Sequence, residues 1–299
     1  MEFALPKDAT VLVLGAASWN RLIHVKDLPQ GHSATIFAAR ESETAGSTGV
    51  GKAMALAAFG CAPVLQCSLG RDAHAANIIA TCQDYGIRML VDESDAPTAH
   101  HLNVMDENGG RYSIFLSNGF PDPQIVDVRL ANAFSAASTI FLSLCVSSKR
   151  ILHLLAGSKA EILLDLHDYD GASPWYDDFI VCADVIQLSD VALPEPRAII
   201  DRLLSGRERQ VVLTKGKEGA EIFAENTHQE IPICLAKMVD SNGAGDTFSV
   251  ALWLAQRQGL SLFDAGKVAA TAAAFAIEDP RLFPKEVSFA QVVERAATW

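Results

Sequence analysis

The hydrophobic pattern of the chain alternates between short apolar runs and longer Ala-rich or amphipathic segments. Runs of four to six residues bounded by glycine or polar residues are typical of buried parallel strands. Segments of ten or more residues that follow a capping residue are typical of helices. The pattern predicts strands at 10–14, 63–67, 87–91, 139–142, 161–166, 185–188 and 210–214, and helices at 49–59, 72–85, 244–258, 261–277 and 288–297. Such βα alternation predicts an α/β fold, a doubly wound and mostly parallel sheet flanked by helices.

Two regions break this rhythm. Residues 22–28 and 34–40 form two extended stretches, and residues 98–115 alternate around Glu107-Asn108-Gly109-Gly110, a hairpin signal. We expect them to pair in a small β-sheet outside the main body. A further antiparallel pair is expected at 220–224 and 229–234. The sequence therefore predicts a single domain, 1–299, with a lid formed by about 20–42 and 97–117.

The stretch DSNGAGDTF, residues 240–248, has the local chemistry of an anion site. Gly243 and Gly245 permit a tight turn, and the next amides start a helix, where they have no helical partners and face anions. Asp246 lies in that first turn, within reach of a hydroxyl held beside the anion. An anion cradle beside a base is what phosphoryl transfer to an alcohol requires. The simpler alternative is an aspartate that only caps a helix.

Composition excludes several classes of function. The chain has 299 residues, 49% of them hydrophobic, and a formal net charge of −12. That charge argues against nucleic acid as a partner, since phosphate backbones select basic surfaces. No apolar run is long enough to span a membrane, and the N-terminus has no signal-peptide pattern. The six cysteines are scattered without a CxxC pair, as in a reducing compartment. We therefore expect a cytoplasmic protein.

DSNGAGDTF resembles the DTxGAGDxF signature of the ribokinase-like carbohydrate kinases, the group of ribokinase, fructokinase and adenosine kinase. The likeness extends along most of the chain. The resemblance implies a ribokinase-like fold, Asp246 as the catalytic base, and Gly243, Ala244 and Gly245 as the anion hole. It also implies ATP and Mg²⁺ as cofactors and allows a monovalent cation.

Residues 46–53, GSTGVGKA, nearly match the P-loop GxxxxGK[ST]. However, Ala53 stands where the Mg²⁺-binding hydroxyl belongs, and the polar ESETA precedes it instead of a buried strand. AGSTGVGKAMALAAFG also resembles the family's AGGxxxNxAxxLAxLG signature, which forms the sugar-binding turn and the first helix. That resemblance places Gly46 and Ser47 against the substrate and puts Gly51 at the position of the family's substrate-binding asparagine.

A second departure from the family pattern lies at Asn20. Family members usually have GxxxxD after the first strand, with the aspartate binding sugar hydroxyls, whereas GAASWN places an amide there. An amide both donates and accepts hydrogen bonds, so the resemblance keeps Asn20 as a substrate-binding residue with different preferences. Together with Gly51, it indicates an acceptor other than the common sugars. Asn20 as a residue that only orders the turn is the alternative.

The nucleotide and metal residues also follow from the resemblance. TKGKEG, residues 214–219, resembles the TxGxxG element beside the phosphates, which implies Thr214, Gly216 and Gly219 as cofactor-binding residues. Thr271 falls near the family's adenine contact. Asp165 matches the first position of a DxN stretch and is a candidate near Mg²⁺ or phosphate, with capping as the alternative.

The family's NxxE motif, which organises Mg²⁺ through water, reads Ser189-Asp190-Val191-Ala192 here. Both characteristic residues are missing, and Asp190 is the candidate substitute, because Mg²⁺ needs few direct carboxylates.

Some residues near the expected pocket have no assigned direction. His100 and His101 are neighbours on a strand, so at most one faces the substrate. Lys52 and Trp19 lie close to the pocket in sequence, and Trp175 is expected to pack on the body.

These features predict an ATP-dependent kinase that phosphorylates a hydroxyl of a small sugar or sugar-like substrate. The alternatives are a nucleoside kinase of the same fold and a non-catalytic metabolite-binding relative. The resemblance further implies a homodimer through the lid.

Overall fold

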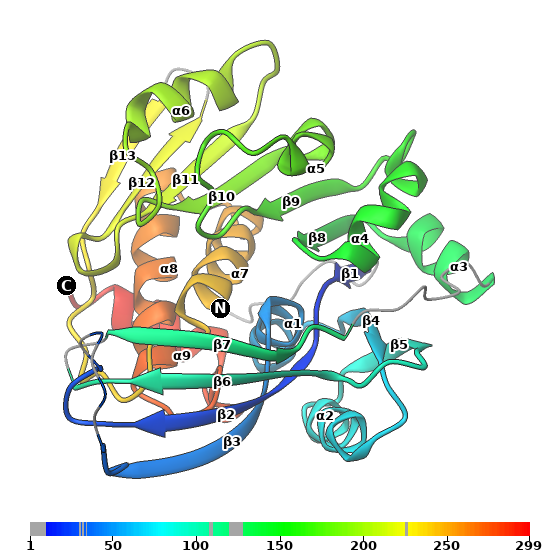
Figure 1. Ribbon diagram of the computed structural model, residues 1–299. Coiled ribbons are helices and arrows are strands. Elements are labelled where there is room, and N and C mark those ends of the chain that lie inside the picture. The colour runs from blue at the N-terminus through cyan, green and yellow to red at the C-terminus, as the bar shows by residue number, and fades with distance from the viewer. Residues whose placement is uncertain are drawn as a thin grey trace.

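A nine-stranded sheet forms the body of the protein in a computed structural model that describes residues 10–29, 31, 33, 35–107, 110–119, 128–224 and 227–299. The strand order is β13-β12-β11-β10-β9-β8-β1-β4-β5, and β12 and β13 are the antiparallel members (Figure 1). The strands are β1 (Val11–Leu14), β4 (Val64–Leu69), β5 (Arg88–Glu93), β8 (Thr139–Ser143), β9 (Glu161–Asp165), β10 (Val185–Ser189), β11 (Gln210–Thr214), β12 (Ala220–Ala224) and β13 (Thr227–Ile231).

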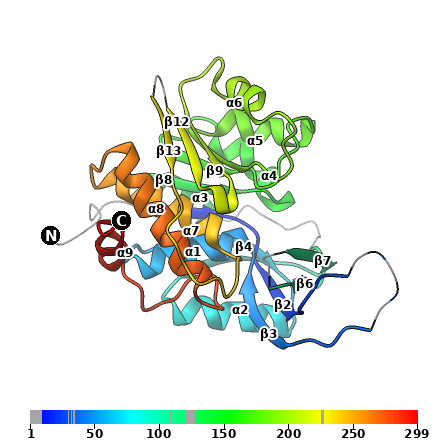
Figure 2. The same cartoon turned by 90° about the vertical axis from the view of Figure 1, so that its left-hand side faces the viewer.

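Helices cover both faces of this sheet and create two hydrophobic cores (Figure 2). One core contains residues of α1 (Thr48–Ala58), α2 (Ala73–Asp84), α7 (Ala244–Arg257), α8 (Leu262–Ile277) and α9 (Phe289–Ala296). The other contains residues of α3 (Val128–Ala136), α4 (Val146–Ile151), η1 (Leu152–Leu155), α5 (Asp177–Cys182) and α6 (Pro196–Leu204). Trp175 of η2 (Pro174–Tyr176) packs against the second core, as expected. The doubly wound fold is confirmed.

A separate four-stranded sheet, the lid, has the order β3-β2-β6-β7. It consists of β2 (Ser18–His24), β3 (Arg40–Gly46), β6 (Ala99–Met105) and β7 (Arg111–Ser117). β2 and β6 are parallel, and β3 and β7 pair antiparallel at the two edges. The lid lies beside α1 and α7 (Figure 1). Of the predicted hairpin turn, Asn108 and Gly109 lie outside the described residues.

The sequence misplaced the first two lid strands. We expected extended stretches at 22–28 and 34–40, but β2 begins at Ser18 and β3 runs from Arg40 to Gly46. The polar sequence RESETAG buries only Ala45 and Gly46, so it carries no apolar signal. Pairing with β2 therefore makes this segment a strand. As a consequence, Asn20 lies within a strand and not in a turn.

Local signals placed the helices better than the lid strands. Asp72 caps α2, because its carboxylate accepts a hydrogen bond from the amide of Ala75 at 2.9 Å. Ser261 caps α8 in the same way through the amide of Asp264. Among the described helices, none has the combined length and apolar character to cross a membrane.

Candidate active site

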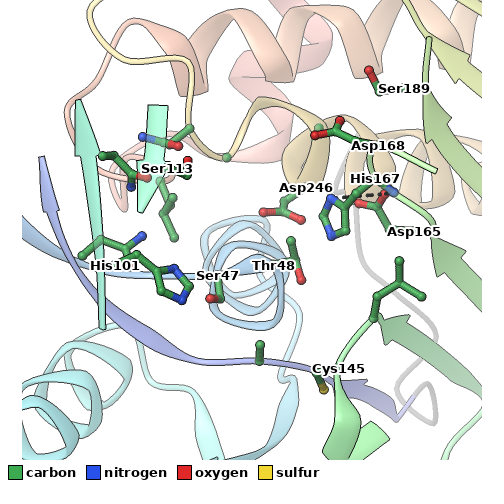
Figure 3. Close-up of a pocket in the computed structure, with 18 of the residues that line it drawn as sticks. Ser47, Thr48, His101, Ser113, Cys145, Asp165, His167, Asp168, Ser189 and Asp246 are labelled. Atoms are coloured by element: carbon green, nitrogen blue, oxygen red, sulfur yellow. Dashed lines mark hydrogen bonds and ion pairs between the residues drawn. The ribbon is translucent and has the colours of Figure 1, made fainter. Parts of the chain in front are cut away.

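A cavity of about 900 Å³ lies between the lid and the carboxyl ends of the body strands. Residues from β9, β10, β11, the start of α7 and the inner face of the lid line it. Figure 3 shows Asp246, Asp165 and His167 in its centre, with His101 and Ser113 of the lid across from them. Several predicted residues from distant parts of the sequence thus meet at one place, among them Asn20, Thr214 and Asp246.

The first turn of α7 forms one wall of the cavity. Gly243 is the N-cap with φ 80°, a left-handed conformation that glycine adopts readily. A Cβ at Gly243 would lie 2.4 Å from the carbonyl oxygen of Leu282, so the position also requires close backbone approach. The first helical hydrogen bond runs from the amide of Thr247 to Gly243. The amides of Ala244 and Gly245 precede it and have no helical acceptor, the arrangement of an anion cradle.

Asp246 lies in this first turn, lines the cavity and is 7% exposed. Its Oδ1 accepts a hydrogen bond from Nζ of Lys52 at 2.5 Å. Burial raises the pKa of Asp246, and the neighbouring Asp165 raises it further, while Lys52 opposes both. A carboxylate with a raised pKa is a better proton acceptor than an ordinary surface aspartate.

Lys52 is the unexpected member of the site. It lies on α1, is 0% exposed, and also donates from Nζ to Oδ2 of Asp165 at 2.9 Å. Burial disfavours the charge, but the two carboxylates outweigh burial and raise the pKa of Lys52. A buried lysine held between two carboxylates stays charged, and it links α1, β9 and α7 at one point.

Asp165, the last residue of β9, uses both carboxylate oxygens inside the protein. Oδ2 accepts from Lys52, and Oδ1 accepts from the amide of His167 at 3.0 Å. Burial opposes its ionisation, yet the His167 ring, the Lys52 charge and these hydrogen bonds lower its pKa to about 2. Asp165 therefore anchors Lys52, and its place near Mg²⁺ or phosphate stays a prediction.

Gly51 lies in the buried face of α1 and makes room for the base. A Cβ at this position would lie 2.4 Å from Oδ2 of Asp246. Gly51 is not among the residues that line the cavity, because the Asp246 carboxylate covers it, and its contact with the substrate stays a prediction.

Asn20 and Ser47 line the cavity as predicted residues of the acceptor side. The Ser18 hydroxyl donates to Oδ1 of Asn20 at 2.7 Å and lies 2.7 Å from the Ser47 hydroxyl. Gly46 is covered by Asn20, since a Cβ there would lie 2.0 Å from Nδ2 of Asn20. Gly46 thus supports the asparagine from behind and does not line the cavity.

On the nucleotide side, Thr214 lines the cavity at the end of β11. Gly216 and Gly219 lie in the turn to β12 and adopt positive φ values of 53° and 90°, outside the cavity lining. Thr271 is 0% exposed and donates to the carbonyl of Lys267 at 2.8 Å within α8. The adenine contact at Thr271 stays a prediction, and the structure shows its hydroxyl bonded inside the protein.

Asp168 is a further candidate for Mg²⁺ beside the predicted Asp165 and Asp190, and Asp165 also lines the cavity. Asp190 follows β10 but does not line the cavity, whereas Asp168 does and is exposed to it. Figure 3 shows Asp168 close to Ser189. No cluster of three metal-binding side chains occurs within the described ranges. One open carboxylate beside bound phosphates still suits Mg²⁺, which keeps most of its waters.

His167 is a cavity residue that sequence reasoning passed over. It has φ 48° without being a glycine, and such backbone strain is concentrated at functional sites. Its half-buried ring lies beside Asp165 and lines the cavity. The signal in the sequence was its place two residues after Asp165, where the DxN resemblance has an amide.

The lid presents an aromatic pair to the cavity. The rings of His101 and Phe115 lie 4.0 Å apart, and both residues line the cavity. Burial lowers the pKa of His101 to about 4, so the ring is neutral at pH 7. His100 faces the opposite side and contacts His74 of α2, and Trp19 donates to Glu43 on that same outer face.

Comparison with known proteins decides the family. The model of the pfkB family of carbohydrate kinases matches residues 186–282. Acarbose 7(IV)-phosphotransferase from an Actinoplanes species is 26% identical over 98% of this chain and its own full length. The solved structure of a microbiome-derived acarbose kinase superposes with a TM-score of 0.85 and 25% identity, over 97% of this chain and 99% of that one. The chain carries a carbohydrate kinase domain of the pfkB family, and its relatives are ribokinase-like kinases.

Further pfkB-family relatives agree with this assignment. Ribokinase from Arabidopsis thaliana is 25% identical over 90% of this chain and 76% of its own. Its structure in complex with ribose and ATP covers 97% of this chain and 99% of that one, with a TM-score of 0.80 and 20% identity, a likeness of fold. Like the other family members, this protein is a phosphotransferase with an alcohol group as acceptor.

Proposed function

We propose that the protein transfers the γ-phosphoryl group of ATP to a hydroxyl of a sugar or sugar-like molecule. The observation that carries the proposal is the first turn of α7, where amides without a helical acceptor precede Asp246 and where Gly243, Gly245 and Asp246 line a cavity of about 900 Å³. The relatives named for acarbose, ribose and deoxyribose phosphorylation support a sugar acceptor.

Each part of the cavity has its own role in the proposed reaction. Asp246 accepts the proton of the attacking hydroxyl, and its raised pKa suits that task. The amides of Gly243, Ala244 and Gly245 stabilise the charge on the transferred group. Thr214 borders the nucleotide side, while Asn20 and Ser47 face the acceptor. The lid over the cavity excludes water, which would otherwise divert ATP to hydrolysis.

Mg²⁺ would be held by Asp168 together with the phosphates of ATP, and it would neutralise part of their charge. Asp168 offers the donor type that Mg²⁺ prefers and is exposed to the cavity. Asp190, the earlier candidate, lies outside the lining. A requirement for a monovalent cation rests on the family resemblance alone, and ADP release with and without K⁺ tests it.

The decisive experiment is ADP release over a panel of monosaccharides, acarbose, sugar acids and nucleosides, comparing wild type with Asp246→Asn. The substitution keeps the shape and removes the base, so we expect a loss of roughly 10²–10⁴-fold in kcat. Asp201→Asn is the matched control, because Asp201 is exposed on α6. Equal rates in Asp246→Asn and wild type would contradict the assignment of Asp246 as the catalytic base. A panel without turnover, in which a compound still raises Tm, would favour a binding protein.

A homodimer through the lid is the second part of the proposal. β7 is an edge strand, and the exposed side chains of Tyr112, Ile114 and Leu116 alternate with those that line the cavity. An exposed apolar edge strand requires cover. Sedimentation should give twice 32.0 kDa for wild type. Ile114→Glu should give the monomer, whereas Val181→Glu on exposed α5 should not. A monomeric wild type would contradict the dimer.

The cytoplasm is the proposed location, because ATP is available there. The six free cysteines support this location, since a reducing compartment keeps thiols unpaired.

A further inference from the structure

We infer that Lys52 is a positioning residue that holds the base Asp246 against the acceptor site through an ion pair anchored on Asp165. This inference rests on the proposed function of the same cavity. It concerns a side chain to which neither the resemblance nor the comparisons assign a role.

Within the described residues, two carboxylates pair with the charge of Lys52. Its side chain is 1% exposed, and Nζ lies 2.9 Å from Asp165 and 2.5 Å from Asp246. A buried charge is tolerated only when it is paired and hydrogen-bonded. Both pairing carboxylates are themselves buried, so none of the three groups finds compensation in water.

The glycine before Lys52 makes the contact possible. Gly51 leaves the space that the Asp246 carboxylate occupies, since a Cβ would lie 2.4 Å from Oδ2. Position 51 and position 52 of α1 therefore act together, one by admitting the carboxylate and the other by binding it. An asparagine at position 51 would exclude this orientation of Asp246.

The two carboxylates have different tasks. Asp165 has both oxygens occupied and a pKa of about 2, so it keeps its charge and retains Lys52. Asp246 has Oδ1 on Lys52, which leaves Oδ2 as the oxygen that accepts a proton. When the acceptor hydroxyl attacks, its O–H bond breaks and the proton moves to Asp246. The oxygen of the acceptor hydroxyl forms a bond to the γ-phosphorus, and the bond from that phosphorus to the leaving oxygen of ADP breaks. Lys52 stays charged and paired with Asp165.

Two single substitutions should change the pKa of Asp246 in opposite directions. Lys52→Met removes the cation that favours ionised Asp246, so the Asp246 pKa should rise by about one unit or more. Asp165→Asn removes the neighbouring anion and keeps Lys52, so the Asp246 pKa should fall. A purely structural role for Lys52 would alter stability without these opposite shifts.

The primary measurement is the titration of the Asp246 carboxyl by ¹³C NMR in protein labelled at aspartate Cγ, with Asp246→Asn to assign the signal. This readout needs no turnover, so it stands even if no acceptor is found. The acid limb of the kcat/KM profile should follow, moving to higher pH in Lys52→Met and to lower pH in Asp165→Asn. An unchanged Asp246 pKa in both variants would overturn the inference while leaving the proposed function intact.

The double variant Lys52→Met/Asp165→Asn controls for folding, because it removes a buried cation and a buried anion together. Its Tm should recover relative to Lys52→Met, but kcat should stay at least 10-fold below wild type, since Asp246 has lost its support. If both Tm and kcat recovered, Lys52 would only compensate the charge of Asp165, and the inference that it positions Asp246 would be refuted. If Lys52→Met does not fold, the Asp246 pKa in Asp165→Asn and the kcat of the double variant still test the inference.

Discussion

The floor and the lid wall of the cavity are built on opposite principles. The floor consists of Asp246, Lys52 and Asp165, three charged groups that are buried, paired and carried by elements of the large sheet and its helices. The lid wall carries the partly buried His101 on β6 and the exposed Phe115 on the edge strand β7. The difference teaches that the chemistry is preorganised on packed elements, whereas contacts to the acceptor are placed on a surface sheet.

Among the substitutions that compare the floor with the lid wall, Gly51→Ala should have the largest effect, because it displaces the base of the floor. The added Cβ collides with Oδ2 of Asp246 at 2.4 Å, so the base must turn away from its position. We expect kcat to fall by about 10²-fold, because misplacing a reacting group by about 1 Å has that cost. Gly266→Ala in α8 is the matched control, since its Cβ meets the Ile231 side chain at the same distance, far from the base. Equal losses of kcat in the two variants would show that disturbed helix packing, and not displacement of Asp246, causes the effect.

A smaller loss is expected from Gly243→Ala at the anion cradle. The alanine must adopt φ 80° and meets the Leu282 carbonyl, so the cradle amides should shift. We expect kcat to fall and KM for ATP to rise, together by about 10–100-fold in kcat/KM. Gly259→Ala, with φ 80° and open space beyond the same helix, measures the strain alone. A loss of activity in Gly259→Ala as large as in Gly243→Ala would refute the cradle argument.

Substitutions on the lid wall should change recognition more than chemistry. Phe115→Ala removes an aromatic face from the acceptor side, so we expect KM for the acceptor to rise about 10-fold with kcat changed by less than about 3-fold. Ile114→Ala, on the outer face of the same strand, should leave both constants unchanged. A kcat loss in Phe115→Ala as large as that of Gly51→Ala would break the division between floor and lid.

The smallest effect concerns the pH dependence of stability. The folded-state pKa of His101 is lowered to about 4 from 6.5, so its neutral form is favoured by folding. This contribution is fully present above pH 6.5 and is lost as the pH falls toward 4. His101→Gln should therefore lose less Tm than wild type between pH 7.5 and 5.0, by on the order of 2 °C. An equal loss in both proteins would contradict the lowered pKa.

The sequence predicted the body because its signals are local. Buried strands read as apolar runs, and residues such as Asp72 and Ser261 cap helices by contacts within a few positions. The lid strands were misplaced since the polar edge strand β3 gains its structure only from pairing with β2. The motif at 240–248 located the base, because an anion cradle is encoded in one short stretch.

The rest of the site depends on contacts that no local pattern contains. Lys52 meets residues 113 and 194 positions away, and its only sequence signal was a lone charge in an Ala-rich helix. Thr271 was assigned to the adenine contact from its place in the sequence, and that pattern does not contain the hydrogen bond from its hydroxyl to the carbonyl of Lys267. Asp168 and His167 lie in the cavity because the chain turns sharply after β9.

Gly51 also constrains how this protein can change over generations. Because the carboxylate of Asp246 fills the space beside Gly51, a single substitution that restores a side chain at position 51 displaces the base before any new contact with the acceptor is gained. Position 51 is therefore coupled to position 52. A side chain at position 51 fits only if the Asp246 carboxylate lies elsewhere, and Lys52 at position 52 holds that carboxylate where it is.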